Sequence, residues 1–396
     1  MTVRVDRAWR PGHRRLAGSL LAALGLVACG RADPQGSCAS APGGGLVRLD
    51  PSARFVDGAA QPFEPRGIGS YPLLDHAGWG RLDAVRAIYD RALGLARPLV
   101  RTGAYLTGGS NPGRLRDSDG TIREEGLAAL DRVVLEAQAR GVRLVLVLAN
   151  HWQDYGGAPA TLAAVAPGEA LPVSAFYTDE RAIADQERYV AVIVGRVSSL
   201  DGRPYATNET IFAWELVNEP RCDGCDPGAL VAWSSRMSRA VRAAGAIQLV
   251  AWGGVGYAGA HGEDFDRLAR EGGLDVMTLH LYPDIAGGLS LGGDGDAAHS
   301  LWAALEAGAD TIRDRARRAR AAGVPLLLEE AGWRGTDEGR RDPERALVLG
   351  AWLAAAHEEG VGVLPWMIAE PDRPDYDGYL IDVARDPRTV EVLGCD

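Results

Sequence analysis

Eight short apolar segments recur along the chain, and longer stretches with helical periodicity separate them. Short apolar runs bounded by turn residues are typical of buried strands, and their alternation with helices predicts repeated βα units and a parallel sheet. The expected strands are residues 63–71, 98–102, 142–148, 211–219, 247–252, 276–280, 325–330 and 361–368. Because eight parallel strands close a barrel, the pattern predicts an α/β fold of the (β/α)₈ TIM barrel type.

The stretches between these segments predict the helices of the barrel. In 127–140, apolar residues recur every three or four positions, and Gly141 follows as a typical helix end. Similar patterns cover 180–197, 230–244, 301–322 and 344–359. A doubly wound sheet would carry a G-x-G-x-x-G turn after its first strand, and none stands there. A short hairpin of 47–50 with 53–56 is expected to cover the barrel floor.

Residues 1–28 have the features of a signal peptide. Arginines precede an apolar run at 16–28 that is too short to span a bilayer comfortably. The run is followed directly by Cys29 in the sequence LVAC, which resembles the lipobox of bacterial lipoproteins, where the Cys is lipidated. An ordinary secretory signal is the alternative, and the pair Arg14-Arg15 is also compatible with twin-arginine export.

The expected organisation beyond the signal peptide is simple. Residues 29–45 are small and rich in Pro and Gly, which predicts a flexible tether, and 46–396 are expected to form one domain. We therefore expect an exported protein, either anchored by lipid at the cell surface or in the periplasm, or secreted.

The cysteines support export independently. If Cys29 carries lipid, four of the five remain, and an oxidising compartment would allow them to pair. The simplest pairing is Cys222 with Cys225, which leaves Cys38 for Cys395. A redox or zinc motif at Cys222 and Cys225 is the alternative, but a second Cys/His pair for zinc is missing.

The charge of the chain limits its partners. A formal net charge of -11 without a basic, aromatic-rich stripe argues against nucleic acid and favours a neutral or weakly charged substrate.

Polar residues stand where several of the expected strands end, and in a barrel these side chains face the active-site mouth. They are Arg101, Asn150, Trp152, Asn218, Glu219, His280, Tyr282, Glu329, Glu330 and Trp366. Two carboxylates from separate strands, with aromatic side chains beside them, are what glycoside cleavage requires. This chemistry needs neither a metal nor a cofactor, and we expect none.

The surrounding groups have natural roles in that chemistry. Arg101 and Tyr282 are expected to hold Glu330 ionised. Asn218 is expected to bond a sugar 2-hydroxyl, and His280 to orient the network.

The remaining residues of the set are expected to bind substrate. Asn150 and Trp152 line the mouth, and Trp366 offers a flat apolar face to a pyranose ring. A single Glu at a strand end is more often a solvated rim residue or half of a salt bridge, so the prediction depends on finding two together. Within Glu329-Glu330, strand alternation predicts that only one side chain points into the barrel.

Several longer segments make the chain resemble glycoside hydrolase family 5, and within it the endo-β-1,4-mannanases, from residue 46 to near the end. The segment 212–222, FAWELVNEPRC, is similar to the family block in which Asn-Glu-Pro carries the acid/base. Further similar segments are 150–157, 176–196, 280–284 and 375–379. The first of these favours a mannanase over a cellulase.

The resemblance implies roles for particular residues. It makes Glu219 the acid/base, and it selects Glu330 over Glu329 as the nucleophile, because the family nucleophile precedes an aromatic residue and a Gly. A disulfide between Cys222 and Cys225 also matches one found in fungal-type members.

The sequence departs from the family pattern at three places. Ala331 replaces the aromatic residue after the nucleophile, which loosens the packing behind it. His151 replaces an Asn, and the loop near Gly254 lacks the usual Glu. The last two departures bear on the sugars accepted at outlying subsites.

The function expected from all of this is a retaining hydrolase that cuts internal β-1,4-mannosidic bonds by double displacement, in a single catalytic domain. The substrate would be mannan or a related β-glycan, the membrane contact would be the lipid anchor, and the protein would be a monomer. A β-1,4-glucanase or transglycosylase of the same family is the alternative enzyme. A surface lipoprotein that binds glycan without cleaving it is the alternative from another class.

Overall fold

The computed structural model describes residues 44–283, 301–334, 338–370 and 374–394. The expected signal peptide, the lipidation site Cys29 and most of the tether lie outside the described residues, as do Cys38 and Cys395.

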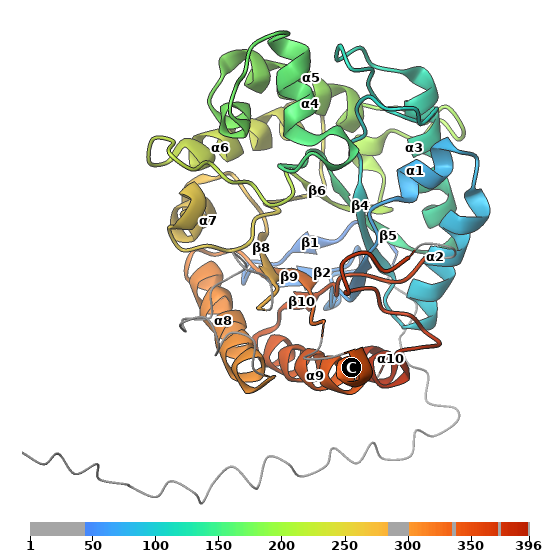
Figure 1. Ribbon diagram of the computed structural model, residues 1–396, viewed down its shortest axis with the longest axis vertical. Coiled ribbons are helices and arrows are strands. Elements are labelled where there is room, and N and C mark those ends of the chain that lie inside the picture. The colour runs from blue at the N-terminus through green and yellow to red at the C-terminus, as the bar shows by residue number, and fades with distance from the viewer. Residues whose placement is uncertain (1–43, 284–300, 335–337, 371–373, 395–396) are drawn as a thin grey trace, which may run out of the picture. The chain divides into compact units, whose positions relative to one another are not determined.

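Parallel strands form a closed barrel at the centre of the fold (Figure 1). They are β3 (Gly67–Gly69), β4 (Leu99–Gly103), β5 (Arg143–Val147), β6 (Ile211–Glu215), β7 (Leu249–Ala251), β8 (Met277–Leu281), β9 (Leu326–Ala331) and β10 (Gly362–Val363). The strands pair in chain order, and single parallel bridges, Ala251 with Val276 and Arg66 with Val363, join the two sheets into a ring. The predicted barrel is confirmed. The strands are buried throughout, which explains why they read as unbroken apolar runs.

Helices surround the barrel (Figure 1). They are α1 (Leu73–Gly78), α2 (Leu82–Gly94), α3 (Glu124–Arg140), α4 (Gly157–Val165), α5 (Glu180–Val194), α6 (Ala229–Ala243), α7 (Phe265–Glu271), α8 (Leu301–Ala321), α9 (Arg341–Glu359) and α10 (Pro387–Gly394). The five helices expected from periodicity are α3, α5, α6, α8 and α9, and Gly141 ends α3 with a left-handed φ of 69°. In the parts of the chain that the structure describes, none of the helices combines the length and the apolar composition needed to span a bilayer.

A short hairpin closes the amino-terminal end of the barrel. It consists of β1 (Arg48–Leu49) and β2 (Phe55–Val56), paired antiparallel. The ring of Phe55 lies 5.7 Å from that of Phe212 on β6, and Phe63 stacks on the same ring at 5.8 Å. The hairpin thus seals an apolar layer inside the strands, as expected, and leaves the carboxyl end open.

Candidate active site

The carboxyl ends of the strands open into a cleft of about 440 Å³. It is lined by all the residues predicted to catalyse or to bind substrate: Arg101, Asn150, Trp152, Asn218, Glu219, His280, Tyr282, Glu330 and Trp366. The strand ends therefore bring together side chains that are as much as 265 positions apart, from residue 101 to residue 366.

Glu219 lies just beyond β6, with its backbone in the left-handed region at a φ of 48°. That conformation is strained for a residue with a side chain, and such strain gathers at functional sites. The Glu219 N–H donates to the carbonyl of Gly253 at 2.7 Å. Its Oε1 lies 3.0 Å from Nδ1 of His280, and the indole N–H of Trp152 donates to Oε2 at 2.7 Å. The carboxyl group is thereby fixed through both oxygens.

The contact between Glu219 and His280 shifts the pKa of both groups. Burial raises the pKa of Glu219, but the His280 ring and the Trp152 N–H outweigh burial and lower that pKa to about 2. Burial lowers the pKa of His280, but the carboxylates of Glu330 and Glu219 raise it to about 10. At neutral pH the pair therefore holds one mobile proton, and in the free protein that proton lies on His280.

The raised pKa of His280 predicts a pH-dependent contribution to folding stability. The folded pKa of His280, about 10, lies above the ordinary 6.5, so its stabilising effect is complete below about pH 6.5 and is lost as the pH rises through 10. We expect the unfolding free energy lost in His280→Asn to be largest near about pH 6 and to shrink by about pH 10. Urea denaturation of both proteins across this range measures it, and a pH-independent difference would contradict the charge assignment.

Glu330, on β9, is held by the two groups expected from the sequence. Nη1 of Arg101 donates to Oε1 at 2.5 Å, and the Tyr282 hydroxyl donates to Oε2 at 2.6 Å. Burial and the neighbouring Glu330 carboxylate raise the pKa of the Tyr282 phenol well above its usual range, so the hydroxyl remains a donor. One cation and one neutral donor thus hold the two oxygens of the Glu330 carboxyl group.

The two carboxyl groups face each other across a short gap. Polar side-chain atoms of Glu219, His280 and Glu330 all lie within 4.8 Å of one another. Three such groups at this spacing are also a possible cation site. However, the guanidinium of Arg101 already sits on Glu330, and the His280 ring itself carries positive charge, so a metal ion would meet two like charges.

Glu215 is a member of the site that the sequence interpretation missed. It lies in β6, is fully buried, and accepts two hydrogen bonds from Arg101, at 2.6 Å and 2.7 Å. Glu215 thus fixes the orientation of the Arg101 guanidinium through Nε and Nη2, and Nη1 of the same group reaches Glu330. A single acidic residue inside the apolar run 211–217 was the signal that could have revealed it.

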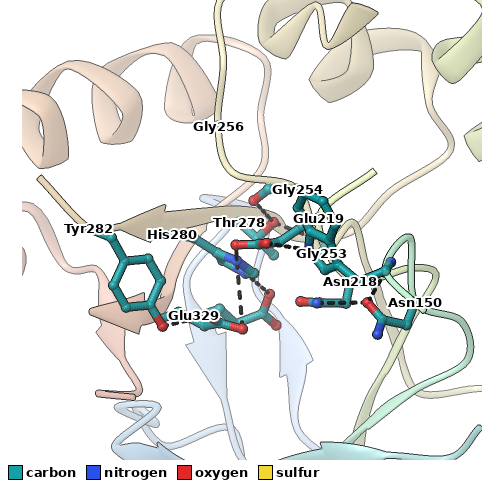
Figure 2. A network of polar contacts seen from close by, with 12 residues as sticks. Asn150, Asn218, Glu219, Gly253, Gly254, Gly256, Thr278, His280, Tyr282 and Glu329 are labelled. Carbon is teal, nitrogen blue, oxygen red and sulfur yellow. Dashed lines mark hydrogen bonds and ion pairs between the residues drawn. The ribbon is translucent and has the colours of Figure 1, made fainter. Parts of the chain in front are cut away.

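The expectation that only one of Glu329 and Glu330 points into the barrel is wrong. The β8–β9 register shifts between Leu279 and His280, so that Leu279 pairs with Leu328 and His280 with Glu330. Glu329 is the extra residue of this bulge, which breaks the alternation of side chains. Its carboxylate lies 3.7 Å from Nε2 of His280, on the opposite side of the ring from Glu219 (Figure 2).

The neutral polar groups form a chain beside Arg101. Oδ1 of Asn218 accepts from Arg101 at 2.7 Å, and Nδ2 of Asn218 donates to Oδ1 of Asn150 at 3.0 Å (Figure 2). Within the described residues the second hydrogen on Nδ2 has no acceptor, which leaves it for a ligand hydroxyl. On the other wall, Trp366 stacks on Tyr71 with ring centres 5.4 Å apart and planes at 10°.

The predicted disulfide between Cys222 and Cys225 is present. The Cys222 N–H donates to the carbonyl of His261 at 2.8 Å, which joins this loop to the one after β7. In that second loop, buried Glu263 accepts from the Trp252 indole at 3.0 Å and has its carboxylate beside Gly254. The loop near Gly254 lacks the Glu usual in the family, but the carboxylate of Glu263, nine positions later in the chain, lies beside this glycine.

The contact between Trp152 and Glu219 gives a direct prediction. Trp152→Phe keeps an aromatic ring and removes the indole N–H, so we expect kcat/KM to fall about 10-fold or more, the usual effect of losing one hydrogen bond to a charged group. Thermal stability should change little, because Trp152 is 37% exposed. Trp79→Phe, at a 52% exposed Trp outside the cleft lining, is the matched control. Equal kcat/KM in the two variants would contradict the assigned contact.

Two acidic side chains that face each other at the open end of a (β/α)₈ barrel are typical of a glycoside hydrolase. A family model described as GH family 5 beta-mannosidase-like matches residues 108–346, well over half of the chain. The chain therefore belongs to glycoside hydrolase family 5, in its β-mannosidase-like group.

Relatives and solved structures agree with this family. Putative mannan endo-1,4-beta-mannosidase 5 of Oryza sativa subsp. japonica is 31% identical over 384 residues, covering 88% of this chain and 75% of the relative. Mannan endo-1,4-beta-mannosidase A of Aspergillus aculeatus is 34% identical over 220 residues, 52% of each chain. The structure of the hyperthermostable endo-1,4-beta-D-mannanase of Thermotoga petrophila RKU-1 matches with a TM-score of 0.72 at 25% identity, covering 84% of this chain and 98% of that one.

Proposed function

We propose that this protein is a mannan endo-1,4-β-mannosidase that cleaves internal β-1,4-mannosidic bonds with retention of anomeric configuration. The single observation that carries the proposal is the pair Glu219 and Glu330, whose carboxylate oxygens lie within 4.8 Å of each other in the cleft. Retaining enzymes need a short separation of about 5 to 5.5 Å between carboxyl groups, because one of them attacks the sugar directly. The names of the similar plant, fungal and bacterial proteins support mannan as the substrate.

In the first half of the reaction, Glu330 attacks the anomeric carbon while Glu219 protonates the departing oxygen. Arg101 and Tyr282 each donate to one oxygen of Glu330 and so fix the orientation of the attacking carboxyl group. The proton comes from the Glu219–His280 pair: it moves from Nδ1 of His280 to Oε1 of Glu219 and then to the leaving oxygen. This leaves a glycosyl ester on Glu330 and an ionised Glu219.

In the second half, Glu219 takes a proton from water as that water attacks the anomeric carbon, and the ester bond to Glu330 breaks. The sugar leaves with its original configuration and the proton returns to the Glu219–His280 pair. The free N–H of Asn218 is placed to bond a 2-hydroxyl, and the Trp366 ring to cover the apolar face of a pyranose.

Product analysis tests this function. We expect release of reducing ends from mannan, little from carboxymethylcellulose or mixed-linkage glucan, and internal cleavage of mannohexaose into di-, tri- and tetrasaccharides. Proton NMR at early times should show β-anomers first. Preference for the glucans would make the protein a β-1,4-glucanase of the same family. Release of mannose alone from the chain end would contradict endo action.

We also propose that the chain is exported and anchored by lipid on Cys29. The arginine-rich start, the short apolar run and the LVAC sequence support this, as does the Cys222–Cys225 disulfide, since such bonds persist in oxidising compartments. Labelled palmitate should enter the wild type expressed in a bacterial host with lipoprotein processing, but not Cys29→Ser. Equal labelling of both proteins would refute the anchor.

A further inference from the structure

Glu329 is a buried acidic residue that neither half of the proposed reaction uses. It is fully buried at the β9 bulge, and in the described part of the chain neither of its oxygens has a hydrogen-bond partner. Leaving a carboxylate so poorly satisfied is costly, and a neutral residue would fill the same space at lower cost. An acidic residue at position 329 in spite of this cost indicates that its charge has a role.

Charged groups from three strands face Glu329. Nε2 of His280 on β8 lies 3.7 Å from its Oε2, and Nε of Arg101 on β4 lies 3.9 Å from the same atom. Glu215 on β6 is the acidic neighbour. Burial and the Glu215 charge raise the pKa of Glu329 to about 7, against the opposing effect of His280 and Arg101. Above about pH 7 Glu329 is therefore ionised, and a carboxylate faces Nε2 of His280.

His280 connects Glu329 to the proposed acid/base. Its Nδ1 contacts Glu219 at 3.0 Å, while its Nε2 has no hydrogen-bond partner in the described residues and faces Glu329 (Figure 2). The charged or titratable groups around the ring are Glu219 beyond β6, Glu329 and Glu330 on β9, Arg101 on β4 and Glu263 in the loop before α7. Glu329 is the carboxylate that lies on the Nε2 side.

We propose that Glu329 is a positioning residue that acts through His280: its carboxylate keeps a proton on Nε2, so that the proton on Nδ1 is the one exchanged with Glu219. This inference rests on the proposed acid/base role of Glu219. In the resting enzyme the ring carries both protons. When the Nδ1 proton passes to Glu219 and on to the leaving oxygen, the ring is neutral and keeps its proton on Nε2, facing Glu329. The proton taken from water in the second half restores the starting state.

The test is the pH profile of kcat/KM on mannohexaose. Glu329→Gln removes the charge and keeps the size, so the Glu219–His280 pair loses its mobile proton more easily, and the basic limb should move to lower pH by about one unit or more. Glu329→Asp keeps the charge and should keep the basic limb close to that of the wild type. A basic limb in Glu329→Gln that coincides with wild type would overturn the proposal, as would an equal shift in Glu329→Asp.

A matched control comes from a second buried carboxylate–imidazole contact, outside the cleft lining, where Glu370 lies 2.8 Å from Nε2 of His76. Glu370→Gln should leave the profile unchanged, and an equal shift there would show a general effect of net charge and overturn the specific role of Glu329. The wild type also provides a direct test of the protonation of the His280 ring. In ¹⁵N-histidine NMR spectra at pH 7, both ring nitrogens of His280, assigned by comparison with His280→Asn, should carry protons. A neutral ring protonated on Nδ1 would overturn the proposal.

These outcomes separate this inference from the proposed function. If wild type cleaves mannan, Glu219→Ala loses turnover and the Glu329→Gln profile is unmoved, only the role of Glu329 fails. If wild type cleaves no glycan, the proposed function fails, and the NMR spectra still decide which ring nitrogen is protonated.

Discussion

Glu330→Ala is expected to lower kcat on mannan by about five orders of magnitude, because it removes the proposed nucleophile of the step that forms the glycosyl ester. Arg101 and Tyr282 each donate a hydrogen bond to this carboxylate, so its removal leaves these two donors facing an empty pocket. Reducing-end assays measure the loss, and circular dichroism shows whether the variant is folded. Near-normal turnover in a folded variant would refute the assignment.

Azide distinguishes the two carboxylates by product. A small anion can enter the space left by Glu330→Ala and attack an activated aryl β-mannobioside, which should yield an α-glycosyl azide. In Glu219→Ala the ester still forms, and azide should intercept it to yield the β-anomer. The reverse pair of products would mean that the roles are exchanged. The α-anomer from both variants would mean that no ester forms.

Arg101→Met is expected to lower the free energy of unfolding by about 3 to 5 kcal/mol, the usual effect of leaving a buried charge without its partner. The partner is Glu215, which is fully buried and bonded twice by Arg101. Activity should fall by about three orders of magnitude, since Glu330 loses its cation and its alignment. Guanidinium denaturation and kcat on mannan are the two measurements.

The double variant separates these two effects. Arg101→Met with Glu215→Leu removes both charges and fills the space with apolar atoms, so most of the lost stability should return. Activity should not return, because Glu330 still lacks its cation. If the double variant is as unstable as the single one, the loss does not come from an unpaired Glu215.

The carboxyl ends of most strands were predictable to within about two residues because the information is local, although β6 and β10 end at Glu215 and Val363, four and five residues before the expected ends. The polar residue that follows an apolar run marks the end of the strand in the sequence. The barrel fold then places these strand ends together at the active-site mouth. Glu219 and His280 could therefore be assigned to one cleft before any contact between them was known. The disulfide between Cys222 and Cys225 was also local, since only two residues separate them.

The short helices were harder to predict for a physical reason. α1 and α7 present only six and seven residues, less than the window in which a period of 3.6 is recognisable. Packing against the barrel, rather than their own pattern, stabilises helices of this length.

The sequence by itself determined which fold forms and which residues gather at its mouth, because strand ends and helical periods are properties of neighbouring residues. Only the tertiary structure decided how the buried charges connect. The register shift between β8 and β9 turns Glu329 toward His280, and the pairing of β4 with β5 and of β5 with β6 brings Arg101 onto Glu215. Register and burial depend on strands far apart in the chain, so no local pattern contains them.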